Sequence, residues 1–141
     1  MRKMFSGCSS LKELNLKNFN TNKVTNMSNM FSVCLSLNEL IINNFNTGNV
    51  TNMSYMFYKC SSLKELNINN FNTDNVAYMD NMFNGCSSLK ELNFINFNTN
   101  NIIEINGMFY GCSDELIKEI KIKYKDIRKE AFEEEEINEE Y

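Results

Sequence analysis

A 26-residue repeat organises most of the chain. Five cysteines are separated by this interval without any insertion: Cys8, Cys34, Cys60, Cys86 and Cys112. A Met-Phe pair precedes each cysteine by the same offset, and the tetrapeptide Asn-Phe-Asn-Thr begins at positions 18, 44, 70 and 96. A fixed period of this length is typical of solenoids, propellers and repeat arrays. One repeat alone cannot bury enough apolar surface to offset the loss of chain entropy, so we expect stacking between repeats to stabilise the fold.

Each repeat has two parts with different apolar spacing. Residues 11–16 have the form Leu-x-x-Leu-x-Leu, whose final alternation predicts a strand with one buried face, and the form returns at 37–42, 63–68 and 89–94. The apolar residues of the second part are three, three, one and three positions apart: Val24, Met27, Met30, Phe31 and Cys34. This spacing predicts a short helical segment, α or 3₁₀, with Asn20 or Thr21 as its cap.

These patterns predict an α/β solenoid, a leucine-rich-repeat-like stack of 26-residue coils with one parallel β-strand and one short helical segment per repeat. We expect residues 1–113 to form this repeat region, with a partial first coil and four strand-bearing repeats. Residues 114–141 are expected to form a C-terminal cap, with a terminal strand over 117–122 and an acidic helix from Tyr124. They contain 11 acidic and 6 basic side chains, so the alternative to a polar cap is an acidic interaction tail.

The motifs Met-Phe-x-x-Cys, Ser-Leu-x-x-Leu, Asn-Phe-x-Thr and Val-x-x-Met-x-x-Met-Phe follow one another in fixed order. In this they resemble the BspA-like leucine-rich-repeat family, in the variant common in mycoplasma-type surface proteins. The resemblance covers residues 4–112. It implies a surface or secreted protein that acts in adhesion and host contact. The chain opens inside a repeat with no signal peptide, so a cytoplasmic location stays open as the alternative.

Composition argues against several classes of function. Histidine is absent, which excludes Ser-His and Cys-His nucleophile pairs and mixed Cys/His zinc sites. The net charge is −4, with no basic stripe of the kind that collects phosphates, and no apolar run is long enough to span a bilayer. We therefore expect no enzyme activity, no cofactor, no nucleic-acid binding and no membrane insertion.

The five cysteines are expected to form a structural ladder inside the stack. Equivalent side chains on stacked coils form a row, whereas zinc needs four ligands converging on one point. Parallel in-register side chains also keep their Cβ atoms farther apart than a disulfide allows, and the odd number leaves one thiol over. We expect buried, reduced thiols and no metal.

Strand positions that point away from the core are candidates for partner binding. Four glutamates recur there, with lysine beside three of them: Glu13, Glu39, Glu65 and Glu91. The structural interpretation is a charge-compensated ladder, and the alternatives are a partner-binding face or calcium coordination, which lacks a supporting Asp-rich loop.

Positions that break the period are further candidates, because a specific site must differ from coil to coil. On the strand side, Asn15, Asn67 and Asn93 align with Ile41, and Ile95 replaces a polar residue found in the other repeats. On the opposite side, tyrosine occupies positions where other repeats have Asn, Ser or Gly: Tyr55, Tyr58, Tyr78 and Tyr110. Exposed tyrosine suits an interface because it supplies large contact area at low entropic cost.

Two further expectations concern the corner and the first coil. The asparagines of the Asn-Phe-Asn-Thr motif are expected to form ladders that satisfy backbone groups of neighbouring coils. The first coil has no polar cover in this sequence, which predicts a tendency to form a homodimer through it.

The leading functional hypothesis is a non-enzymatic protein-interaction or adhesion module that displays a repeat-built surface to another protein or cell-surface macromolecule. The alternative is a structural scaffold that self-associates end to end.

Overall fold

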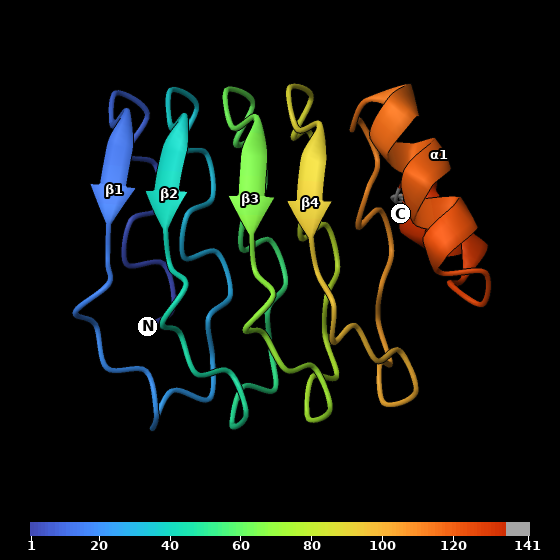
Figure 1. Ribbon diagram of the computed structural model, residues 1–141, viewed down its shortest axis with the longest axis horizontal. Helices are drawn as coiled ribbons and strands as arrows, with labels where there is room; N and C mark the ends of the chain where they lie inside the picture. Colours follow the sequence, from blue (N-terminus) through green and yellow to red (C-terminus); the bar gives the residue numbers. More distant parts are fainter. Residues whose placement is uncertain (135–141) are drawn as a thin grey trace, which may run out of the picture.

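The repeat becomes a stack of coils in the computed structural model, which describes residues 1–134 (Figure 1). Each coil carries one three-residue strand: β1 (Glu13–Asn15), β2 (Glu39–Ile41), β3 (Glu65–Asn67) and β4 (Glu91–Asn93). We number the coils by their strands, coil 1 being 9–34, coil 2 35–60, coil 3 61–86 and coil 4 87–112. The pairs β1–β2 and β3–β4 are parallel, and partner residues such as Glu13 and Glu39 are one repeat apart. The predicted parallel pairing is confirmed for these two pairs.

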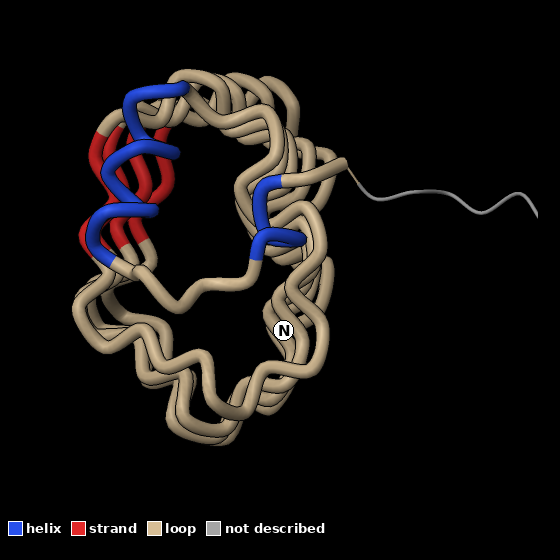
Figure 2. The backbone as a smooth tube through the Cα atoms, turned by 90° about the vertical axis from the view of Figure 1, so that its right-hand side faces the viewer, coloured by secondary structure: helices blue, strands red, loops and turns tan. Residues whose placement is uncertain are grey.

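The wall opposite the strands consists of turns (Figure 2). It is formed by five equivalent segments, which we call the turn runs: 1–8, 27–34, 53–60, 79–86 and 105–112. The prediction of a helical segment here is wrong. Within one run the N–H groups of Met30, Ser32 and Cys34 each donate to the carbonyl three residues earlier, so the backbone makes overlapping four-residue turns.

Positive backbone φ angles and pairing between coils explain why no helix forms. Asn29 has φ 57° and Val33 has φ 61°, a left-handed conformation that interrupts a right-handed helix. The N–H groups of Asn29, Phe31 and Val33 donate to carbonyls of the next run, and that of Met27 donates to the carbonyl of Asn52 just before that run, instead of to their own run. Because the spacing of three fits overlapping turns as well as a helix, the apolar pattern alone did not distinguish the two.

The core lies between the two walls and consists of columns of identical side chains. The rings of Phe5, Phe31, Phe57, Phe83 and Phe109 stack with centroids 5.4–5.7 Å apart. Methionines and leucines at equivalent positions are buried beside them. A column of this kind binds each coil to both neighbours, so stability depends on the stack.

Asparagine and threonine side chains hold the corner between strand and turn run. The Thr21 hydroxyl donates to the Asn46 carbonyl and accepts from the Asn46 N–H. In the same way, Thr47 exchanges two hydrogen bonds with Asn72, and Thr73 exchanges two with Asn98. The Nδ2 groups of Asn44 and Asn70 donate to the carbonyls of Phe19 and Phe45. The expected corner ladder is therefore present, while Asn20 stabilises a tight turn at Asn22 and caps no helix.

The C-terminal cap differs from the prediction. The expected strand over 117–122 lies within helix α1 (Asp114–Lys123), which Ser113 caps by accepting from the Leu116 N–H. The expected helix from Tyr124 is replaced by the 3₁₀ segment η1 (Lys129–Phe132), and residues 135–141, the end of the segment expected to form the acidic helix or tail, lie outside the described residues. An N-terminal capping serine with acidic residues in the first turn and lysines in the last favours the helix over the strand.

The C-terminal cap occupies the place of one more coil. In the view along the stack, α1 covers the strand wall and η1 covers the turn wall (Figure 2). Gly107 and Phe109 donate their N–H groups to the carbonyls of Glu130 and Ala131, and the Phe132 ring continues the phenylalanine column at 5.8 Å from Phe109. Arg128 donates to the carbonyls of Ile102 and Ile103. The last coil therefore has a partner on its outer face.

Candidate functional site

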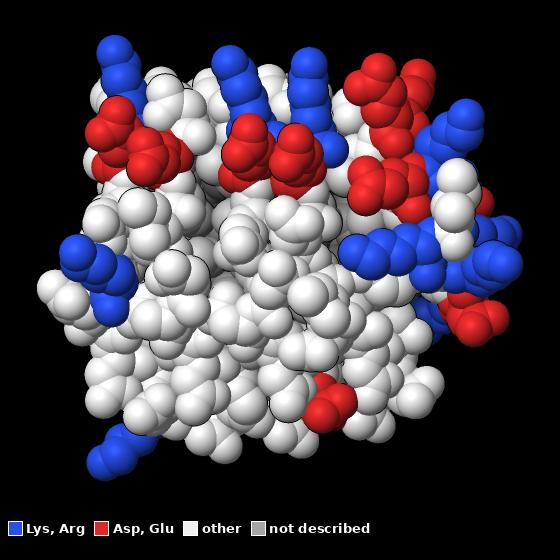
Figure 3. All heavy atoms as spheres, viewed as in Figure 1, with Lys and Arg blue, Asp and Glu red and all other residues white. Residues whose placement is uncertain are grey.

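The four glutamates of the strand wall begin their strands and are exposed: Glu13, Glu39, Glu65 and Glu91. Acidic side chains form a row across the strands in Figure 3, with basic side chains beyond them. The register places Glu13 opposite Glu39 and Glu65 opposite Glu91, so like charges lie side by side within each pair. Such pairing costs free energy unless a cation lies nearby. Lys12, Lys64 and Lys90 each precede a glutamate in sequence, but within residues 1–134 none of the three forms an ion pair with a glutamate, so the expected charge compensation stays a prediction.

The strand wall is open between β2 and β3. In coils 1 and 2, Asn38 N–H donates to the Lys12 carbonyl and Leu16 N–H donates to the Ile41 carbonyl. In coils 3 and 4, Lys90 and Ile68 make the equivalent bonds. Among the described residues, no equivalent backbone bond joins coils 2 and 3, and the strands form two separate two-stranded sheets. The turn runs of the same two coils remain paired, with Met53 donating to Tyr78 and Phe57 to Met82.

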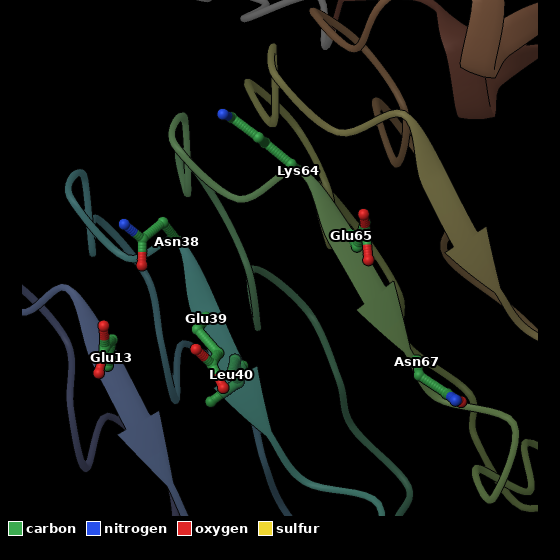
Figure 4. A pocket seen from close by; sticks show the side chains of 7 residues that line it. All are labelled: Glu13, Asn38, Glu39, Leu40, Lys64, Glu65 and Asn67. Atoms are coloured by element: carbon green, nitrogen blue, oxygen red, sulfur yellow. The ribbon is translucent and has the colours of Figure 1, made fainter.

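A groove lies over this opening, with a volume of about 640 Å³. Seven residues of coils 1–3 line it, and we call it the strand-face groove: Glu13, Asn38, Glu39, Leu40, Lys64, Glu65 and Asn67 (Figure 4). The lining combines three carboxylates, one ammonium group, two amides and one partly buried leucine. These groups can bind a partner that offers cations and hydrogen-bond donors beside a small apolar group.

The predicted strand-side candidates are divided between this groove and other places. Glu13, Glu39, Glu65 and Asn67 line the groove, and Asn15, Asn93 and Glu91 are exposed elsewhere on the same wall. Ile41 is half-buried at the end of β2 and does not line the groove, while Ile95 is 67% exposed beyond the end of β4. The structure does not bring the two isoleucines together, because Ile41 belongs to coil 2 and Ile95 to coil 4, with coil 3 between them.

The tyrosine candidates lie on the turn wall. The rings of Tyr55 and Tyr58 meet edge to face at 5.4 Å, and the Lys59 ammonium lies 5.1 Å from the centre of the Tyr58 ring. Tyr55, Tyr58 and Tyr78 are half-buried. Tyr110 is exposed, and the nearby charge of Glu134 raises its pKa above the usual value. The tyrosines are therefore separate from the strand-face groove.

The cysteines are free thiols, four of them buried and one exposed. Each buried Sγ lies 3.1–3.2 Å from a phenylalanine carbonyl of the preceding turn run, as Cys60 does from Phe31. Burial raises the pKa of Cys34 to about 11 and those of Cys60 and Cys112 to about 12, and it raises the pKa of Cys86 as well. Cys8 differs from the expectation of a buried thiol, because it is exposed in the first of the five described turn runs.

Asp80 is a buried acidic residue that the repeat pattern did not single out. It occupies the position of Ser28 and Ser54 in the preceding turn runs, so the replacement of serine by an acid was the available signal. Its burial, together with the neighbouring Glu104 carboxyl, raises the pKa of Asp80 to about 6. Asn38, Leu40 and Lys64 also line the groove but were not among the candidates, because they follow the repeat consensus or differ from it only slightly.

Neither a metal-ligand cluster nor a membrane-spanning helix is present in residues 1–134. No cluster of three or more His, Cys, Asp or Glu side chains in this range could hold a metal ion. No helix in the same range has the length and apolar character to cross a membrane.

Comparison with solved structures identifies a protein with a similar fold. It is a leucine-rich cell surface protein from Faecalibacterium prausnitzii, with a TM-score of 0.55 and 22% sequence identity, and the match covers 79% of this chain. This chain spans only 27% of that protein. No curated protein matches the sequence.

The family comparison covers most of the repeat region and the start of the cap. A family model described as "Mycoplasma protein of unknown function, DUF285" matches residues 1–121. Those residues include all five turn runs, all four strands and most of α1. The chain therefore belongs to this repeat family, DUF285.

Proposed function

We propose that the protein is a non-enzymatic module that binds another protein through the strand wall of a repeat solenoid, at a cell surface or as a secreted protein. The observation that carries the proposal is the strand-face groove. It lies where the strand wall and the turn wall, which are built from the same repeat, differ in their hydrogen bonding. The turn wall pairs through every coil, whereas the strand wall opens at β2 and β3 and presents charged and amide groups there. The solved leucine-rich cell surface protein supports the proposed location.

The groove is suited to recognition because its side chains are held by a rigid stack. The side chains of Glu39 and Glu65 project from adjacent coils whose turn runs are hydrogen-bonded to each other. Little conformational entropy of the backbone is then lost when a partner binds. The mixture of carboxylates with Lys64 and two amides favours a polypeptide partner bearing basic and polar side chains over an anionic one.

A peptide-display selection on the purified protein tests the proposal. Selected peptides should be enriched in lysine or arginine, and Glu39→Lys or Glu65→Lys should weaken their binding at least about tenfold, because charge reversal replaces attraction with repulsion. Lys23→Glu on the exposed corner is the control and should change binding little. Selected peptides that bind both groove variants as well as they bind the wild type would contradict the proposal.

The second candidate function is a scaffold that self-associates through the N-terminal end of the stack, which is formed by turn run 1–8 and coil 1. Apolar side chains are exposed there, with Met4 49% and Phe19 38% accessible, and the Phe5 ring is only partly buried against Phe31. Light scattering at increasing concentration measures this association directly. Met4→Glu should abolish association if the first coil mediates it, whereas groove variants should not affect it.

The isoleucine candidates distinguish the two functions. Ile95→Asp, and Ile41→Asp provided that it folds, should reduce partner binding if they contribute to a binding surface. A change in self-association with no change in peptide binding would favour the scaffold.

A further inference from the structure

A pocket in the C-terminal cap has a lining opposite in charge to that of the strand-face groove. It is formed by the last turn of α1, the loop after it and η1, and its volume is about 380 Å³. Pockets that bind small ligands typically enclose roughly 300–1,000 Å³, so this one has room for a side chain of a partner. Seven residues line it, and we call it the cap pocket: Lys121, Tyr124, Lys125, Ile127, Lys129, Phe132 and Glu133.

The floor of the cap pocket is apolar. Tyr124, Ile127 and Phe132 are half-buried and pack against the core of the stack. The Phe132 ring stacks on Phe109, the last ring of the phenylalanine column, and the Lys121 ammonium lies over the same ring, 4.6 Å from its centre. This cation–π contact holds a positive charge beside the apolar floor.

Three lysines form the rim of the pocket, and two of them have no carboxylate partner in residues 1–134. Lys121, Lys125 and Lys129 are all exposed. Lys129 forms an ion pair with Glu133 at 3.9 Å, and both of these side chains are largely in solvent, where such a pair contributes little. The ammonium groups of Lys121 and Lys125 are therefore available to carboxylates of a partner.

The positive charge of the rim belongs to a wider basic segment in an acidic protein. Residues 118–129 contain six of the chain's 14 basic side chains and only two acidic ones, whereas the chain as a whole has a net charge of −4. Lys and Arg side chains gather over the cap in Figure 3. A local concentration of one charge attracts ligands of the opposite charge and raises their rate of encounter.

We propose that the cap pocket binds an acidic peptide segment of another protein. Carboxylates of the segment pair with Lys121 and Lys125, and an apolar side chain between them contacts the floor at Ile127 and Phe132. A concave apolar floor with a charged rim favours a peptide over an anionic membrane, because Glu133 lines the pocket and Glu119 lies on the same helix, where both would repel an anionic bilayer. This site is separate from the strand-face groove, for which we propose a basic partner.

Fluorescence anisotropy with the full chain and a fluorescein-labelled peptide, Glu-Glu-Leu-Glu-Glu, tests the proposal. We expect saturable binding at low ionic strength that weakens as salt is added. Lys121→Glu and Lys125→Glu should each weaken binding about five- to tenfold, because charge reversal replaces attraction with repulsion. Lys118→Glu is the matched control, an exposed lysine of α1 outside the pocket lining, and should change binding less than about twofold. All three side chains are exposed, so we expect each variant to fold.

A second peptide and a groove variant define the site further. Replacing the leucine of the peptide by serine should weaken binding about tenfold, because the contact with the floor is lost. Glu39→Lys changes the strand-face groove and should leave binding of the acidic peptide unchanged, so this proposal and the proposed function can fail separately.

Four outcomes would overturn the proposal. The first is equal binding of the leucine and serine peptides, and the second is an equal effect of Lys118→Glu and Lys125→Glu, since either would mean attraction to charge without a pocket. The third is binding to phosphatidylserine vesicles with no binding of the peptide. The fourth is peptide binding that tightens tenfold when the glutamates at 135, 136, 139 and 140 are replaced by glutamine, since the occupant would then be a segment of the same chain.

Discussion

The two walls of the stack are built from the same repeat but differ in how their coils are hydrogen-bonded. The turn wall is hydrogen-bonded through every turn run and continues into η1, with buried phenylalanines and methionines behind it. The strand wall is interrupted between β2 and β3, and its outward residues carry charge. Positions that must pack allow little variation, whereas outward positions on an interrupted wall can vary without disturbing the stack. The turn wall therefore holds the coils together, and the strand wall is the one that we propose for recognition.

The largest expected difference is in thiol reactivity, between the buried cysteines of the turn wall and the exposed Cys8. The pKa of Cys60 is raised to about 12 from 9.0, which lowers its thiolate fraction about a thousandfold relative to an ordinary thiol. In native protein at pH 8, a colorimetric thiol reagent should modify Cys8 rapidly and the four buried thiols only after denaturation. Rapid modification of two or more thiols in the native protein would contradict the packing.

Removal of one ring from the phenylalanine column should cost the most stability. Phe57 is fully buried and stacks on Phe31 and Phe83, so Phe57→Ala should lower the free energy of unfolding by about 3–5 kcal/mol. Urea denaturation followed by circular dichroism measures the loss. Phe57→Leu is the control and should cost less because it keeps most of the volume. An alanine variant within 1 kcal/mol of the leucine variant would show that the column contributes little.

A side chain added to the left-handed turn at Gly107 should also destabilise the turn wall. The residue has φ 60°, and a Cβ atom there would lie 2.6 Å from Oδ1 of Asn81. We expect Gly107→Ala to cost about 1–3 kcal/mol in the same denaturation assay. Gly7 has a similar positive φ, but a Cβ atom there would meet nothing within 4 Å. Gly7→Ala should therefore cost less stability than Gly107→Ala. Equal losses of stability in the two variants would show that the effect comes from the backbone conformation alone and not from the contact with Asn81.

A charge introduced at the exposed end of the strand wall should have the smallest effect on the free energy of unfolding. Ile95 is 67% exposed, so we expect Ile95→Asp to change the free energy of unfolding by less than about 0.5 kcal/mol. Thermal denaturation near neutral pH measures the change. A loss above 1 kcal/mol would mean that this end of the wall is packed and not available to a partner.

The sequence predicted the features that follow directly from its period. Residues such as Leu14 and Leu40 pair because every repeat has the same length, and the corner asparagines bond between coils for the same reason. The turn runs were mistaken for helices because a spacing of three residues fits overlapping turns equally well. The opening between β2 and β3 was not predictable, since Glu39 and Glu65 belong to strands that both fit the consensus.

The cap shows a conflict between two signals. Residues 117–122 repeat the strand pattern, but Ser113 and the acidic residues after it favour a helix start, and the helix forms. Of the candidate site, sequence reasoning identified the glutamates and Asn67, because outward positions are evident from strand alternation. It did not identify which of them share a groove, because that depends on the separation of two neighbouring coils.

Amide exchange at three equivalent residues tests the difference between the walls most directly. Leu16 donates its N–H to Ile41, and Ile68 donates to Asn93, whereas among the described residues the equivalent Ile42 N–H has no carbonyl partner on coil 3. All three side chains are buried to a similar degree. We expect the Ile42 amide to exchange at least about tenfold faster than those of Leu16 and Ile68 under native conditions. Equal protection at the three amides would show that the strand wall is continuous and would contradict the account.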